Sequence, residues 1–156
     1  MIYMSERIPP HNIEAEQSIL GALLIDQEAM TKIADILIAE DFYKETHGQI
    51  FQAMLDIYDK REPLDILSAA GRLKDKGILE TIGGRTYLAE LSNLMPTASN
   101  IVYYAKIVQN KATLRRLLKT SSDISELGFT ESEDVDKILD EAEQRLFSVS
   151  QKFLKK

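Results

Sequence analysis

The chain has 156 residues, 44% of them apolar and 28% charged, a length and balance that suit one folded domain and exclude an intrinsically disordered chain. It has no cysteine, no signal-peptide pattern and no stretch approaching the ~20 apolar residues of a membrane span, so we expect a cytoplasmic protein. The formal net charge of −6 argues against a nucleic-acid-binding surface that covers the whole molecule.

The first predicted element is an amphipathic helix in the stretch "RIPPHNIEAEQSILGALLID", residues 7–26. Asn12 is a good N-cap after two prolines, and Glu14 lies in the first turn, where the helix dipole favours an anion. Helical spacing places four aliphatic side chains on one face: Ile19, Leu20, Leu23 and Leu24. The stretch carries no group suited to catalysis, so we expect a structural or assembly role.

Further short helices follow along the chain. We expect one from about Gln27 to Leu37, one in "HGQIFQAMLDIYDK", one in "DILSAAGRLKDKG" that Gly77 ends, and one in "RTYLAELSNLM" that Pro96 stops. Alternating apolar and polar residues with turn dipeptides are missing, so the sequence predicts an all-α fold with little or no sheet.

The last third of the sequence predicts a helical hairpin. Thr97 can cap a helix of about 30 residues that runs to Gly128, and Thr130 or Ser132 can cap the next one. That last helix has apolar residues in steps of four and three, at Val135, Leu139, Ala142, Leu146, Val149 and Phe153. We therefore expect a compact helical bundle over residues 1–104, a long antiparallel hairpin over 105–153, and the start of a linker at 154–156.

Charge and apolar surface both suggest that the hairpin has partners. Residues 105–130 hold five basic and two acidic side chains. We expect the basic stretch from Lys106 to Lys119 to pair with the acidic stretch from Glu131 to Glu143. Five apolar side chains of the long helix cover ~180° of its circumference, more than the ~100° that one contact buries: Leu114, Leu117, Leu118, Ile124 and Leu127. The expected cover is another copy of the chain or a partner protein.

Catalytic and cofactor-binding patterns are missing. His11 and His47 belong to no cluster with metal-ligand spacing, and no glycine precedes a lysine, so no Walker loop is present. The "GGRT" turn, residues 83–86, is interpreted as a turn before a helix. A basic stripe of Lys111, Arg115 and Lys119 could follow phosphates, although pairing with the acidic last helix is the preferred interpretation. We expect no catalytic residue, metal or cofactor in this chain.

Five segments, in this order, carry a resemblance: "IPPHNIEAEQSILGALLID", "DFYKETHGQIFQAM", "IGGRTYLAEL", "PTASNIVYYAKIV" and "LRRLLKTSSDIS". Together they resemble the N-terminal domain of DnaB-type bacterial and phage replicative DNA helicases. The resemblance implies a small helical body followed by a hairpin, with hairpins pairing between subunits into a threefold collar, a trimer of dimers. Such a collar helps to hold the hexamer together above its ring of ATPase domains, surrounds the DNA path, and docks the C-terminal domain of primase.

The resemblance also implies contact residues. The expected primase-binding residues are Glu14, Tyr87, Leu118 and Ile124, although Tyr87 could instead pack between its helices. From the heptad spacing and the apolar arc of the hairpin itself, the expected oligomer interface consists of Leu114, Leu117, Leu127, Val135, Leu139 and Leu146.

Two alternatives and one departure from the family remain. Family members continue into a linker and an ATPase domain that binds ATP and magnesium, whereas this chain stops at "VSQKFLKK" and is expected to be a non-enzymatic fragment. One alternative is the helicase-interacting C-terminal domain of primase, against which the start "PPHNIEAEQSILGALL" argues. The other is a small single-stranded nucleic-acid-binding module that uses the basic stripe.

Overall fold

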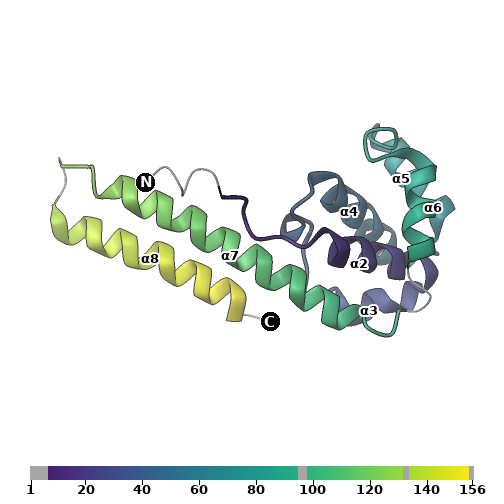
Figure 1. Cartoon of the computed structure of the whole chain (residues 1–156), viewed down its shortest axis with the longest axis horizontal. Coiled ribbons are helices and arrows are strands. Elements are labelled where there is room, and N and C mark those ends of the chain that lie inside the picture. The colour runs from purple at the N-terminus through teal and green to yellow at the C-terminus, as the bar shows by residue number, and fades with distance from the viewer. Residues whose placement is uncertain (1–6, 95–97, 132–133, 155–156) are drawn as a thin grey trace. The chain divides into compact units, whose positions relative to one another are not determined.

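The computed structural model describes residues 7–94, 98–131 and 134–154. These residues form seven α-helices and two 3-10 helices and contain no strand, which confirms the all-α prediction (Figure 1). The chain divides into two compact units, His11–Asn110 and Lys111–Lys156 with Met1–Pro10. The functional division into a body of residues 1–104 and a hairpin of 105–153 stays a prediction, and the expected linker residues 155–156 lie outside the described ones.

The first helix confirms the predicted start. α2 spans Ile13–Ile25, and the side chain of Asn12 accepts a hydrogen bond from the backbone N–H of Ala15 at 2.9 Å. The cap occupies one of the backbone donors that a helix start leaves without an intrahelical partner. The predicted apolar face is buried: Ile19, Leu20, Leu23 and Leu24 all belong to the hydrophobic core.

The second predicted helix is shorter than expected. In place of one helix from Gln27 to Leu37, a 3-10 helix η1 (Gln27–Ala29) leads into the single turn of α3 (Met30–Ile33). The carbonyl oxygen of Ile36 accepts a hydrogen bond from the side-chain amide of Gln109 at 3.1 Å. At this carbonyl, a contact with a distant residue takes the place of the backbone hydrogen bond that a continuing helix would form. A second 3-10 helix, η2 (Ala39–Asp41), follows before α4.

Helices α4 (Glu45–Asp59) and α5 (Ile66–Asp75) pack together and share a charge cluster. Asp56 lies 3.0 Å from both Arg72 and Lys76. Burial by itself raises the pKa of Asp56, but hydrogen bonds from Gln52, Lys76 and Arg72 outweigh it and lower that pKa to about 2. The cluster therefore favours the packed state wherever Asp56 is ionised, and this contribution is lost as the pH falls from about 4 towards 2. Gly77 follows α5 with a φ of +75°, as expected for a glycine that ends a helix.

α6 (Gly84–Leu94) packs closely against α2. The closest approach is at Gly21, where an added β-carbon would overlap the backbone carbonyl oxygen of Leu91. Only glycine fits at this crossing. Leu88 and Leu91 of α6 are fully buried in the same core. Pro96, expected to stop this helix, lies outside the described residues.

The remaining chain forms two long helices. α7 spans Ile101–Leu127 and α8 spans Val135–Leu154, and residues 111–127 of α7 run antiparallel to α8 within one unit (Figure 1). The expected caps Thr97 and Ser132 lie outside the described residues. Thr130 is not the cap, because the side chain of Asp134 accepts a hydrogen bond from the backbone N–H of Asp136 at 3.3 Å.

The buried side of α8 differs from the predicted one. Its half-buried residues are Ile138, Ala142, Arg145 and Val149, spaced four, three and four. Of the predicted apolar stripe, only Ala142 and Val149 belong to this set, while Val135, Leu139 and Leu146 are 66%, 57% and 47% exposed. A helix turns 100° per residue, so neighbouring residues such as Ile138 and Leu139 lie on adjacent stripes of the helix surface. The stripe that α8 buries within the chain is therefore adjacent to the predicted apolar stripe. The described helices include none that is both long and apolar enough to cross a membrane.

We predict that Gly21→Ala lowers the free energy of unfolding by about 2–4 kcal/mol, because the new methyl group forces α2 and α6 apart. The matched control is Gly71→Ala in α5, where nothing lies within 4 Å of an added β-carbon. This control is expected to stabilise the chain by about 0.5–1 kcal/mol, since alanine is the better helix former. Urea denaturation measures both, and equal effects of the two substitutions would contradict the close crossing.

Candidate functional site

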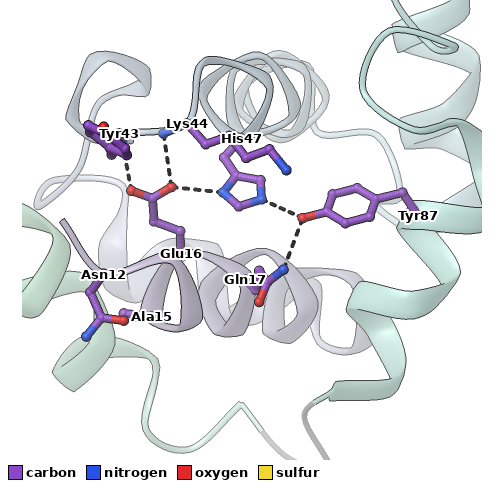
Figure 2. Close-up of polar contacts among 8 residues, drawn as sticks. All are labelled: Asn12, Ala15, Glu16, Gln17, Tyr43, Lys44, His47 and Tyr87. Atoms are coloured by element: carbon purple, nitrogen blue, oxygen red, sulfur yellow. Dashed lines mark hydrogen bonds and ion pairs between the residues drawn. The ribbon is translucent and has the colours of Figure 1, made fainter. Parts of the chain in front are cut away.

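A buried carboxylate joins α2 to the start of α4. Glu16 is 1% exposed, and its oxygens accept hydrogen bonds from the backbone N–H groups of Tyr43 at 2.7 Å and Lys44 at 3.4 Å (Figure 2). Lys44 is the N-cap residue of α4, and no side chain of that segment caps the helix. The carboxylate therefore supplies from α2 the acceptor and the negative charge that a helix N-terminus favours.

The same carboxylate orients a buried histidine. Nδ1 of His47, a residue that is 0% exposed, lies 2.8 Å from Glu16, and Nε2 lies 2.6 Å from the hydroxyl of Tyr87. A carboxylate oxygen accepts, so Nδ1 donates to Glu16, while the direction of the hydrogen bond between Nε2 and the Tyr87 hydroxyl depends on the tautomer of the ring. The side-chain amide of Gln17 donates to the same hydroxyl oxygen at 3.3 Å. One chain of hydrogen bonds thus connects α2, α4 and α6.

The sequence alone does not predict this network, and His47 has no expected partner from residue spacing. The two residues of the Glu16–His47 pair are 31 positions apart, and no spacing rule signals such a contact. His11, the other histidine, stacks on Tyr43 with ring centroids 4.2 Å apart. In the described part of the chain, no three His, Cys, Asp or Glu side chains form a group that could hold a metal ion.

Two of the expected primase-binding residues lie near this network. Tyr87 is half-buried, with its hydroxyl in the network, and Nζ of Lys44 lies 5.3 Å from the centroid of its ring. Glu14 is exposed one turn before Gln17, so both lie on the same side of α2. We call Glu14, Gln17, Lys44 and Tyr87 the body patch.

The other expected contact residues lie in the second unit. On α7, Leu114, Leu117 and Leu118 are 45%, 38% and 47% exposed, whereas Ile124 and Leu127 are half-buried. On α8, a shallow hollow of about 570 Å³ is lined by Asp140, Glu143, Gln144, Leu146, Phe147 and Ser150. Apolar side chains are therefore accessible on both helices of the hairpin.

Cations of the basic stripe have partners within the chain. Lys119 pairs with Asp123 one turn later at 3.4 Å, and Arg115 donates to the carbonyl oxygen of Pro10 at 2.7 Å. On α8, Arg145 pairs with Glu141 of its own helix at 3.0 Å. The ion pairs Lys119–Asp123 and Arg145–Glu141 each lie within one helix and are exposed. Exposed pairs of this kind contribute only a few tenths of a kcal/mol, so they do little to hold α7 against α8.

We predict that Glu16→Gln lowers the free energy of unfolding by about 2 kcal/mol or more, because an amide N–H₂ replaces an acceptor that faces buried donors. The control is Glu14→Gln on the same turn, whose exposed carboxylate contributes less than about 1 kcal/mol through the helix dipole. Urea denaturation of both variants at neutral pH measures the difference. If Glu16→Gln is as stable as Glu14→Gln, the network has no structural importance.

Comparison with known proteins identifies relatives over most of the chain. The family model described as "DnaB-like helicase N terminal domain" matches residues 8–110. The replicative DNA helicase DnaB of Geobacillus stearothermophilus is 47% identical over 148 residues, covering 95% of this chain and 33% of that protein. The replicative DNA helicase DnaC of Bacillus subtilis (strain 168) is 42% identical over 149 residues, covering 96% and 33%. The chain thus spans about a third of the length of these curated relatives.

Solved structures agree with the sequence matches. The crystal structure of the N-terminal domain of DnaB helicase from Mycobacterium tuberculosis has a TM-score of 0.86 and 37% identity, and the match covers 90% of this chain and 99% of that one. A structure described as a DnaB-like replicative helicase and its interactions with primase has a TM-score of 0.75 and 25% identity, covering 88% and 31%. The family match and the shared fold together show that this chain belongs to the DnaB-like helicase N-terminal domain family.

Proposed function

We propose that this chain is the collar domain of a hexameric, cytoplasmic replicative DNA helicase, where it assembles with copies of itself and docks the C-terminal domain of primase. The accessible leucines of the hairpin are the observation that carries the proposal. The relatives named above are replicative DNA helicases, and one solved relative is described with its interactions with primase. ATP and magnesium would act in an ATPase domain of the longer protein, and DNA would pass through the ring with little direct binding by this domain.

Self-association would use the apolar side chains that the hairpin leaves accessible. Leu114 and Leu117 are exposed on α7, and Val135, Leu139 and Leu146 are exposed on α8, with Leu127 half-buried between the two groups along the chain. Single exposed leucines are ordinary, but several on both helices of one hairpin would fit an interface. A twofold pairing of hairpins would place the same residues of two copies in contact.

Primase docking would use the body patch in one unit and, separately, two aliphatic residues of α7 in the other. Leu118 is 47% exposed and Ile124 is half-buried, which suits aliphatic anchors that a partner covers. In the other unit, Glu14 and Tyr87 supply a charged and an aromatic group of the kinds that interfaces commonly use. This assignment uses all four residues expected from the family resemblance.

For self-association, we expect light scattering to show dimers at high concentration, with larger species that approach a trimer of dimers. Leu139→Asp is expected to shift the chain towards monomers, because it puts a charge into a desolvated contact. The control is Leu67→Asp on α5, a leucine that is 66% exposed outside the hairpin. A strict monomer at every concentration, or the same shift for both variants, would remove the assembly role.

For primase docking, we expect Leu118→Asp and Ile124→Asp to weaken binding by ~2 kcal/mol or more, about thirtyfold. Calorimetric titration with the primase of the same organism measures the affinity, again with Leu67→Asp as control. Circular dichroism melts run on each variant show whether it still folds. The docking assignment fails if both variants bind like the parent, and equally if both simply unfold, since these residues would then belong to the hairpin core.

A further inference from the structure

Lys44 occupies a position that helix stability does not explain. It is the N-cap residue of α4, where Ser, Thr, Asp or Asn is preferred and where the helix dipole disfavours a cation. Its side chain forms no cap, and its exposed ammonium forms no ion pair with any residue that the structure describes. Local rules of this kind are often broken at functional sites, so Lys44 calls for a role outside the folding of its own helix.

The ammonium of Lys44 is held over an aromatic ring. Its Nζ lies 5.3 Å from the ring centroid of Tyr87, within the range of a cation–π contact. The ring provides electron density but no hydrogen-bond acceptor atom, so the three N–H donors of the ammonium remain available. A carboxylate approaching from outside the chain would satisfy them.

Tyr87 is itself fixed from inside the body. Its hydroxyl is hydrogen-bonded to Nε2 of His47 at 2.6 Å and accepts from Gln17 at 3.3 Å, and His47 is in turn held by the buried Glu16. Figure 2 shows the Tyr87 hydroxyl directed at His47 and Gln17, so the hydroxyl is engaged within the body. The ring is therefore a rigid platform, which lowers the entropy cost of binding against it.

We propose that Lys44 is a primase-binding residue that pairs with a carboxylate of the docked primase, with the Tyr87 ring as its platform and His47 and Gln17 as positioning residues. The inference rests on the proposed docking function and adds the chemistry of the contact. The body patch carries an anion, Glu14, and a cation, Lys44, on different helices. The complementary primase surface then carries a basic group towards Glu14 and an acidic group towards Lys44, which fixes the orientation of docking.

The test is calorimetric titration of the 156-residue chain with the primase of the same organism, at several salt concentrations. We expect Lys44→Glu to weaken binding about tenfold or more, and Lys44→Met to weaken it severalfold and flatten its salt dependence. The matched control is Lys32→Glu, which reverses the charge of an exposed lysine on α3 and is expected to change the affinity less than about twofold. If Lys44→Glu binds like Lys32→Glu, the inference is wrong.

A double-mutant cycle tests the positioning residues. Tyr87→Phe removes the hydroxyl and keeps the ring, whereas His47→Asn keeps a donor towards Glu16 and loses contact with Tyr87. We expect each to weaken binding about threefold to tenfold and the double variant to be no weaker than either single one, because both break the same contact. Fully additive losses, or an unchanged affinity of Tyr87→Phe, would overturn the positioning role even if His47→Asn fails to fold.

The outcomes separate the two proposals. If the parent chain does not bind primase at all, the docking function fails and this inference fails with it. If the parent binds and Leu118→Asp weakens binding while Lys44→Glu does not, docking stands and only the Lys44 contact is refuted.

Discussion

A carboxylate that is 1% exposed is costly to bury unless donors surround it, and Glu16 has three: two backbone N–H groups at the start of α4 and the imidazole of His47. These bonds connect the first turn of α2 to the first turn of α4, and Tyr87 extends them to α6. Two of these helices, α2 and α6, also pack closely at Gly21, where no side chain separates them. The body is thus held both by close packing and by one buried polar network.

The two candidate surfaces are built on different physical grounds. In the body patch, buried hydrogen bonds hold the hydroxyl of Tyr87, and Nζ of Lys44 lies 5.3 Å from the centroid of its ring. The hairpin instead leaves leucines accessible on α7 and α8, and none of the described residues of α8 is fully buried. A surface of the first kind favours orientation and specificity, and one of the second kind supplies affinity through apolar burial. The proposed function, in which the chain both assembles with its copies and docks a partner, would use each.

The sequence predicted the local features well and the distant ones poorly. Asn12 and the apolar face of α2 were predictable, because capping and helical periodicity involve residues within a few positions of one another. The Glu16–His47 contact was not, since nothing in a single sequence signals a hydrogen bond across 31 positions. On α8, the strongest apolar period pointed to Leu139 and Leu146, but the chain buries the neighbouring stripe that contains Ile138. The apolar periodicity showed that α8 has a contact face, but it did not show whether α7 of the same chain or another molecule covers that face.

A long-range ¹H–¹⁵N correlation spectrum of the His47 imidazole tests directly whether the buried network holds Tyr87 in place. It should be recorded on the chain alone and again with primase bound. We predict a proton on Nδ1 towards Glu16 in both states, with Nε2 hydrogen-bonded to the Tyr87 hydroxyl. A ring without a proton on Nδ1, or one that exchanges rapidly between the two tautomers, would contradict the network and the contact built on it.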